Sequence, residues 1–137
     1  MIVERFKPEH ARQIELQSAQ SDAALVDMPY LEILHSGGPA ATMKDEQGRV
    51  LCCAGLLELP HVSHLWCFLS RHSGPHMLAI YRGAQRLISI ARSPVIATSV
   101  CGFEPGCRLL LMLGFQWCQK LPGMGFSGED HDFYVRQ

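Results

Sequence analysis

The sequence predicts an α/β (or α+β) fold, in which a mixed central sheet of about seven strands is flanked by four helices. Short apolar runs of strand length alternate with helical segments in the order β-α-α-β-β-β-α-β-α-β-β. The stretch 65–92 joins an apolar strand, a glycine-bearing turn and the longest amphipathic helix. With 137 residues and 47% apolar content, the chain is expected to form a single domain, 1–137, with a sizeable core.

The chain is expected to open with a short strand at 2–6 and a helix after it. Pro8 suits a first helical position, and Glu9 places an acid in the first turn. Leu16 is expected to extend the apolar side of this helix. Its other side, predicted to be solvated or to form a recognition face, holds Gln13, Gln17 and Gln20.

A second helix is expected to begin at Ser21 or Asp22. Pro29 is expected to break or kink it, and the glycines and proline at 36–39 to end it. The acidic turn 45–48 then joins two strands, at 40–44 and 50–57, in a hairpin pattern. The second of these strands is almost wholly apolar, as in a central strand that is covered on both faces.

The second half of the chain alternates strands with helices. The strand 65–69 leads through the glycine turn into a helix that is expected to begin near His76. A strand at 95–100 precedes a short apolar helix, 107–113, for which Pro105 suits the start and Gly114 the end. Two last strands, at 115–121 and 132–136, enclose a glycine-rich loop.

Composition excludes several classes of function. The net charge is −1 and no basic field is visible, which argues against nucleic-acid binding. No apolar run approaches the roughly 20 residues that span a bilayer. The first ten residues hold acids and no apolar signal core, so export is not expected. The cysteines are therefore expected to be reduced and mostly buried: Cys52, Cys53, Cys67, Cys101, Cys107 and Cys118.

The turn 71–76, with the sequence RHSGPH, is similar to the loop motif Q/R-x-x-G-x-G/A. Arg71 and Gly74 match this motif, whereas His76 stands at the position of the last small residue. A strand that passes through such a turn into a helix N-terminus can present backbone N–H groups to a phosphate. Many turns of this kind bind nothing, however, and their glycine serves only the turn.

The segment 109–115, LLLMLGF, is similar to an L-Y-x-x-L-G-F helix end. Gly114 and Phe115 match it, and Leu110 falls where that motif has tyrosine. With both motifs in this order, the whole chain resembles the GCN5-related N-acetyltransferase (GNAT) superfamily. Its short segments EH (9–10), IELQ (14–17), SGP (73–75), GCR (106–108) and MLGF (112–115) look most like the small acetyltransferase-like proteins of phages and prophages, of the internal virion protein A type.

The resemblance implies acetyl-CoA or another acyl-CoA as the cofactor. In that superfamily the pantetheine arm pairs with the fourth strand, and the pyrophosphate lies on the amides that follow. The implied cofactor-binding residues are Phe68, Leu69, Ser70, Arg71, Ser73, Gly74, His76 and Met77. Pro75 lacks an N–H group, so a direct contact of His76 or Arg71 with phosphate is an alternative.

Catalysis of acyl transfer needs a base for the amine and an acid for the leaving thiolate. Leu110 cannot be that acid, and Cys107 or Tyr81 is expected near its position. Candidates for the base are Glu58, His61 and His64. No metal site is predicted, because the histidine pairs 61/64 and 72/76 lack a third ligand at a familiar spacing.

Two functional hypotheses stay open. The first is an acyl-CoA-dependent N-acyltransferase that acts on an unknown amine acceptor, with specificity implied to lie in 13–20 and 122–130. The second is a catalytically inactive virion or interaction protein that binds a virion or host protein, a reading that Leu110 and His76 favour. Either is expected in the host cytoplasm or within a virion, and a homo-oligomer is compatible with both.

Overall fold

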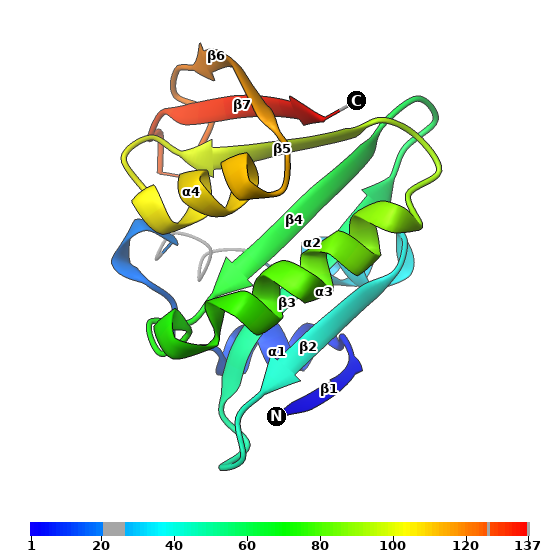
Figure 1. Ribbon diagram of the computed structural model, residues 1–137, viewed down its shortest axis with the longest axis vertical. Coiled ribbons are helices and arrows are strands. Elements are labelled where there is room, and N and C mark those ends of the chain that lie inside the picture. Colours follow the sequence, from blue (N-terminus) through cyan, green and yellow to red (C-terminus); the bar gives the residue numbers. More distant parts are fainter. Residues whose placement is uncertain (21–26, 126, 137) are drawn as a thin grey trace.

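The computed structural model describes residues 1–20, 27–125 and 127–136 (Figure 1). Within them, the strands are β1 (Ile2–Arg5), β2 (Ala40–Lys44), β3 (Val50–Glu58), β4 (Ser63–Leu69), β5 (Val95–Val100), β6 (Gln116–Leu121) and β7 (His131–Arg136). The helices are α1 (Pro8–Gln13), α2 (Met28–Ser36), α3 (Met77–Ser89) and α4 (Glu104–Met112), and the 3₁₀ turn η2 (Gly74–His76) precedes α3. None of the described helices combines the length and the apolar content needed to cross a bilayer.

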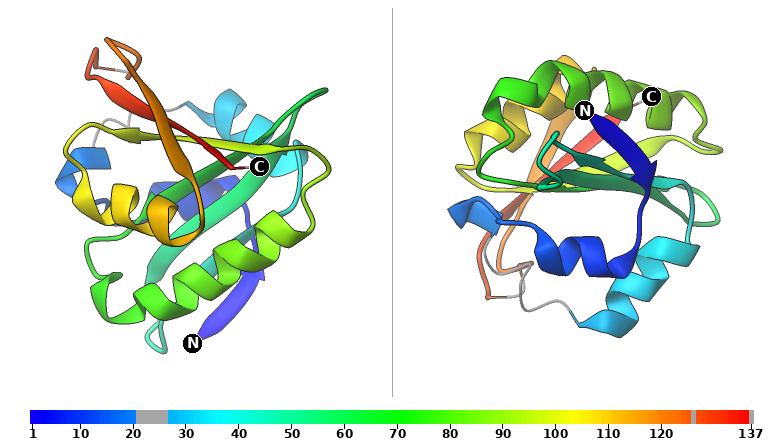
Figure 2. Two further views of the ribbon diagram at one scale, coloured as in Figure 1. Left: turned by 45° about the horizontal axis from the view of Figure 1, so that its top comes forward. Right: turned by 90° about the horizontal axis from the view of Figure 1, so that it is seen from below.

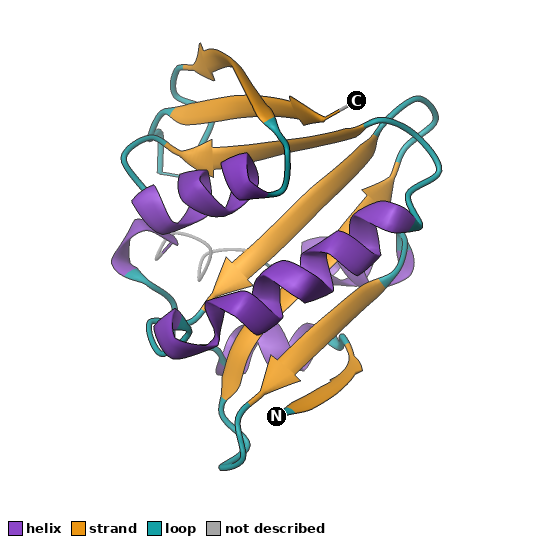
Figure 3. Cartoon of the chain, viewed as in Figure 1, coloured by secondary structure: helices purple, strands orange, loops and turns teal. Residues whose placement is uncertain are grey.

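The strands form one sheet in the order β1-β2-β3-β4-β5-β7-β6. Neighbouring strands are antiparallel, except for β4 and β5, which run parallel. The prediction of a mixed, seven-stranded sheet with four helices is therefore confirmed (Figure 3). The predicted β2–β3 hairpin is also confirmed, and Gly48 adopts a φ of 83° in its turn.

β4 and β5 are paired at one end only. Parallel pairing joins Ser63 to Val95 and His64 to Ile96. Beyond these residues the two strands diverge and form a V that opens toward their C-terminal ends (Figure 1). Each arm is held by its outer neighbour, β3 for β4 and β7 for β5. The inner edge of β4 therefore has backbone groups that do not bond to β5.

Helices cover both faces of the sheet (Figure 2). On one face, Leu65 and Leu69 of the sheet pack with Ile80 of α3. On the other, Trp66 packs with Phe6 and with residues of α2. Cys52 packs in the apolar cluster under α3, and its neighbour Cys53 packs in the cluster under α2. Successive side chains of β3 therefore point to opposite faces, as in a strand that is covered on both.

α1 is shorter than predicted. It ends at Gln13, because Ile14 adopts an extended conformation with φ −73° and ψ 136°. The prediction that Leu16 extends the helix is wrong, since Leu16 instead forms an antiparallel bridge with Ser70 at the end of β4. The prediction of a solvated helix face is wrong for Gln17 and Gln20, whose side chains both bond to the β4 region.

α2 begins at Met28. The helix start that the sequence predicts at Ser21 or Asp22 lies outside the described residues. The observed helix is capped by Asp27, whose carboxylate accepts the Tyr30 N–H at 3.1 Å. The prediction of a break at Pro29 is wrong, because Pro29 lies in the first turn, where its missing N–H has no helical partner to lose.

Gly114 ends α4, as predicted. Its φ is 91°, a conformation that favours glycine. The Gly114 N–H donates to Leu111 O at 3.1 Å and the Phe115 N–H to Leu110 O at 3.0 Å, the pattern of a Schellman cap. Phe115 is only 3% exposed. The matched glycine and phenylalanine of the helix-end motif are thus explained by the fold itself.

Candidate functional site

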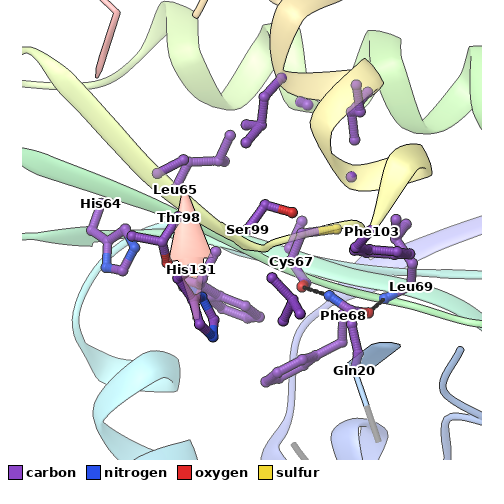
Figure 4. A pocket seen from close by; sticks show the side chains of 18 of the residues that line it. Gln20, His64, Leu65, Cys67, Phe68, Leu69, Thr98, Ser99, Phe103 and His131 are labelled. Carbon is purple, nitrogen blue, oxygen red and sulfur yellow. Dashed lines mark hydrogen bonds between the residues drawn. The ribbon is translucent and has the colours of Figure 1, made fainter. Parts of the chain in front are cut away.

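The divergence of β4 and β5 leaves a channel of about 280 Å³, referred to below as the β4–β5 channel. Residues of β4, β5, α3 and α4 supply most of its wall, and most of the lining side chains are apolar. Its polar members that are labelled in Figure 4 are Gln20, His64, Thr98, Ser99 and His131. The channel is thus a largely apolar passage with a few polar groups, as ligand sites usually are.

The alternation of β4 side chains makes the channel accessible to both faces of the sheet. Leu65 and Leu69 belong to the core under α3, whereas Trp66 belongs to the core under α2. All three line the channel. The channel therefore leads from the α3 side of the sheet, between the strands, to the α2 side.

The inner edge of β4 is covered by the segment that follows α1. Glu15 O accepts the Arg71 N–H at 2.8 Å, and the Gln17 N–H donates to Leu69 O at 3.3 Å. The Gln20 side chain donates to Cys67 O at 3.0 Å and accepts the Leu69 N–H at 2.8 Å. Residues 15–20 thus occupy the β4 edge where the sequence resemblance implies that a pantetheine arm pairs.

In the turn after β4, most backbone N–H groups already donate to oxygen atoms of the protein. Five residues donate their backbone N–H to protein oxygen atoms: Arg71, His72, Ser73, His76 and Met77. Within the described part of the chain, the Gly74 N–H has no acceptor. An anion at this turn would therefore find one free amide, at Gly74, rather than a full ring of them.

Gly74 is not explained by its own backbone or by its packing. Its φ is not positive, and a Cβ atom added to it would meet no atom within 4 Å. The space in front of it belongs to a surface hollow of about 550 Å³, referred to below as the Gly74 hollow. Its lining residues come from the segment after α1, from the turn between β4 and α3 with the first residue of α3, and from α4. They are Gln17, Ser18, Arg71, Ser73, Gly74, Met77, Pro105 and Arg108.

Two cations border the Gly74 hollow, and each is paired with a carboxylate. Arg71 Nη2 lies 2.9 Å from Glu15 Oε1, and Arg108 Nη2 lies 3.6 Å from Glu104 Oε2. The hydrogen bond from His72, followed by the charge of Arg71, lowers the pKa of Glu15. The sequence analysis missed Arg108, because it lies on α4 and only the fold brings it to the turn after β4.

Six of the eight implied cofactor-binding residues line one of the two hollows. Phe68 and Leu69 line the β4–β5 channel. The Gly74 hollow includes Arg71, Ser73, Gly74 and Met77. Ser70 is fully buried and its Oγ accepts the His72 N–H at 3.0 Å, while His76 is half-buried in η2. Ser70 and His76 line neither hollow.

Glu58 and His61, two of the catalytic candidates from the sequence, lie away from the channel. Glu58 pairs with Ser63 at the closed end of the V, and its Oε2 accepts the Arg92 N–H at 3.3 Å. His61 is exposed in the turn between β3 and β4. Cys107 is half-buried on α4, with its Sγ 3.8 Å from the Oγ of Ser99, which lines the channel.

His64 is the base candidate that the fold brings to the channel. It lies on β4 beside Ile96 of β5, where the two strands begin to separate. Burial lowers the pKa of its imidazole below the ordinary 6.5, so the ring is neutral at pH 7 and able to accept a proton. Figure 4 shows His131 and Thr98 on the same side of the sheet. The sequence run 129–132 suggests a solvated loop with weak ion-binding capacity, but His131 begins β7 and lines the channel.

Leu110 is 7% exposed and lines the channel wall. Among the described residues, the phenol that lines the channel is that of Tyr30, whose pKa is raised by burial. The hydroxyl group of Tyr81 accepts a hydrogen bond from Gln85 at 3.0 Å on α3. Tyr134 is 4% exposed, and burial, with a hydrogen bond to Cys107, raises the pKa of its phenol. Neither Tyr81 nor Tyr134 lines the channel. In the described residues no three potential metal ligands gather into a group.

Solved acetyltransferases share this fold. The chain superposes on a GNAT-superfamily phosphinothricin acetyltransferase from Sinorhizobium meliloti in complex with AcCoA (TM-score 0.68, 18% identity, 98% of this chain and 86% of the other). It also matches yncA from Salmonella typhimurium with its cofactor acetyl-CoA (0.71, 18%, 100% and 93%). A chimera of the spermidine N-acetyltransferase SpeG from Vibrio cholerae and hSSAT is similar as well (0.67, 13%, 99% and 95%).

At these identities the likeness establishes the fold and not the activity. No family model and no curated protein matches the chain. The predicted GNAT-like fold is therefore confirmed from the structure, over essentially the whole chain.

Proposed function

We propose that this protein is an acyl-CoA-dependent N-acyltransferase that transfers an acyl group to a primary amine. The observation that carries the proposal is the succession of two hollows along the chain: β4 lines the β4–β5 channel as far as Leu69, and the turn that follows lines the Gly74 hollow from Arg71 onward. Together they offer a narrow apolar passage beside a wider surface site bordered by cations, which matches the thioester arm and the phosphates of an acyl-CoA.

The residues present fit this ligand at the Gly74 hollow. The absence of a side chain at Gly74 leaves open space and an N–H without an acceptor, which is what close approach of a phosphate requires. Arg71 and Arg108 would add charge-assisted hydrogen bonds after exchanging their carboxylate partners. That the similar structures from Sinorhizobium meliloti and Salmonella typhimurium contain acetyl-CoA supports the same assignment.

A bound acyl-CoA would supply a thioester that an amine can attack. The chain's own contribution begins with His64, which is neutral at pH 7 and would take the proton that the amine loses. The apolar walls of the channel, among them Leu65 and Leu69, would exclude water from the reacting groups. The alternatives for the acid, Cys107 and Tyr134, do not line the channel. The protonated ring of His64 would therefore return its proton to the leaving thiolate.

The phage or prophage origin and the packaging in a virion rest on the sequence resemblance alone. A catalytically inactive virion or interaction protein is the alternative, and an absence of acyl-CoA binding would favour it. Occupation of the β4 edge by residues 15–20 gives that alternative its structural basis.

Calorimetric titration with acetyl-CoA, together with thermal shift, tests the proposal, because a ligand specific for the folded state must stabilise it. Gly74→Trp should abolish binding and leave the melting temperature of the free protein nearly unchanged, since the space at Gly74 is open. Ser89→Trp, on the exposed end of α3, is the matched control and should bind as the unmodified protein does. Absence of any shift at millimolar acetyl-CoA would overturn the proposal.

A further inference from the structure

A side-chain amide of the protein itself occupies the inner edge of β4. Gln20 Nε2 donates to Cys67 O at 3.0 Å, and Gln20 Oε1 accepts the Leu69 N–H at 2.8 Å (Figure 4). One amide thereby joins the carbonyl of one residue to the N–H of the residue two positions later. A single residue of a parallel neighbouring strand makes this same pair of bonds. β5 diverges before it reaches Cys67 and Leu69, and the Gln20 side chain makes the two bonds that a residue of a paired strand would make there.

These two backbone groups are the ones that an entering ligand arm would need. Cys67, Leu69 and Gln20 all line the β4–β5 channel. The flexible arm of any acyl-CoA contains two amide groups, and buried amides need hydrogen-bond partners. Because the rest of the lining is largely apolar, an arm amide that passes β4 has Cys67 O and Leu69 N–H as its backbone partners there, and Gln20 already uses both.

We infer that Gln20 is an internal competitor of acyl-CoA, which holds the β4 edge in the free protein and releases it when the arm enters. This inference rests on the function proposed above. The exchange replaces two hydrogen bonds with two of the same kind, so Cys67 O and Leu69 N–H stay satisfied in both states. Only the Gln20 side chain has to move, because the backbone of the segment is held separately by the Gln17–Leu69 and Glu15–Arg71 bonds.

Removal of the competitor should strengthen binding. In Gln20→Ala the acyl-CoA arm no longer has to displace two hydrogen bonds, so acetyl-CoA should bind about 3- to 30-fold more tightly than to the unmodified protein. Gln13→Ala is the matched control, since Gln13 is exposed on α1 and away from both hollows. It should leave the Kd unchanged. A Kd for Gln20→Ala that equals or exceeds that of the unmodified protein overturns the competition.

Hydrogen exchange at Leu69 tests the pairing without any ligand. The Leu69 amide should be protected in the free protein, exchange faster in Gln20→Ala and regain protection when acetyl-CoA is added to that variant. Unchanged protection in the variant overturns the inference, whatever the affinity. If neither protein binds acetyl-CoA, the proposed function fails and the competition fails with it. If both bind with one Kd, the competition alone fails.

Discussion

Arg71 is attached to Glu15 through both its backbone and its side chain. The Arg71 N–H donates to Glu15 O at 2.8 Å, and its guanidinium lies 2.9 Å from Glu15 Oε1. Glu15 Oε2 also lies 2.9 Å from His72 Nε2. One exposed carboxylate therefore neutralises the cation beside Gly74 and fixes the position of the turn that would meet the phosphates.

Glu15→Gln should increase the affinity for acetyl-CoA. The change removes the negative charge that now competes with phosphate for Arg71, while the backbone bond between the two residues remains. Since the pair is exposed, we expect a gain of about 2- to 5-fold at low salt, and the gain should shrink as salt is added. Calorimetric titration at two ionic strengths measures both effects.

Glu9→Gln is the control for net charge, because Glu9 is an exposed acid in α1 that has no contact with Arg71. Equal gains in the two variants would mean that Glu15 acts through overall charge and not through its pairing with Arg71. Weaker binding in Glu15→Gln would show that the ion pair orders the turn for its ligand.

His64 should titrate below its ordinary pKa of 6.5, because burial in the channel wall disfavours the imidazolium ion. NMR titration of the histidine ring protons measures this, and His64→Gln identifies the resonance. With a reactive amine acceptor, the rate of acyl transfer should rise with pH over the same range and then level off, since only the neutral ring accepts a proton. His64→Gln should remove that rise.

His61→Gln should leave the pH profile as it is, because His61 lies in an exposed turn outside the channel. A profile that changes in the His61 variant and persists in the His64 variant would assign the base to His61, as the sequence analysis also allowed.

His10 should make the folded state less stable in mild acid. Its imidazole is 4% exposed, with Nε2 3.0 Å from Glu4 Oε1 and Nδ1 2.7 Å from Thr42 Oγ1. Burial is the larger effect and lowers the pKa of His10 below 6.5, although Glu4 acts in the opposite direction. The unfolded chain then binds the proton more readily. The contribution of His10 to stability is therefore complete above pH 6.5 and is lost as the pH falls through its lowered pKa.

Thermal unfolding at a series of pH values between about 7 and 5 tests this sign. The fall in melting temperature should be less steep in His10→Gln than in the unmodified protein. Identical slopes would mean that the imidazole has the same pKa in the folded and the unfolded chain.

The cysteines should differ sharply in reactivity. Cys118 is exposed, whereas Cys52 and Cys53 are buried. Burial raises the pKa of Cys53 to about 12, and a hydrogen bond with Cys67, together with burial, raises that of Cys52. Because the thiolate is the reactive form, timed alkylation with peptide mapping should label Cys118 first and should label the buried pair only after unfolding. Cys118→Ser should remove the fast phase, and rapid labelling of Cys53 would contradict its burial.

Most helices and strands could be predicted from the sequence, because each is marked by a local pattern of apolar residues and by a glycine or proline at its end. The alternation of apolar runs with helical segments predicted the order of elements along the chain, and Gly114 marked a helix end that the structure explains with a Schellman cap. The errors lie where tertiary contacts override local pattern. Glutamines at helical spacing suggested a longer α1, but the side chains of Gln17 and Gln20 bond to Ser70, just after β4, and to Cys67 on β4, which are distant in the sequence.

The candidate site was less predictable for the same reason. Gly74 carries a motif that can be read from the sequence, whereas Arg108 reaches the Gly74 hollow only because α4 packs beside the turn after β4. Nothing local distinguishes His64 from His61. Strand divergence decides which of the two lines the channel.

The pairing of Ser63 with Val95 and of His64 with Ile96 is the short stretch where β4 and β5, and with them the two halves of the sheet, are joined. It can serve as a hinge between the two arms of the V. Since each arm of the V also pairs with an outer neighbour, β3 for β4 and β7 for β5, a change in the angle between the arms would break neither of those ladders. A molecule that touched both arms would act as a strut across this hinge, so ligand binding should stiffen the whole sheet and not merely the residues in contact.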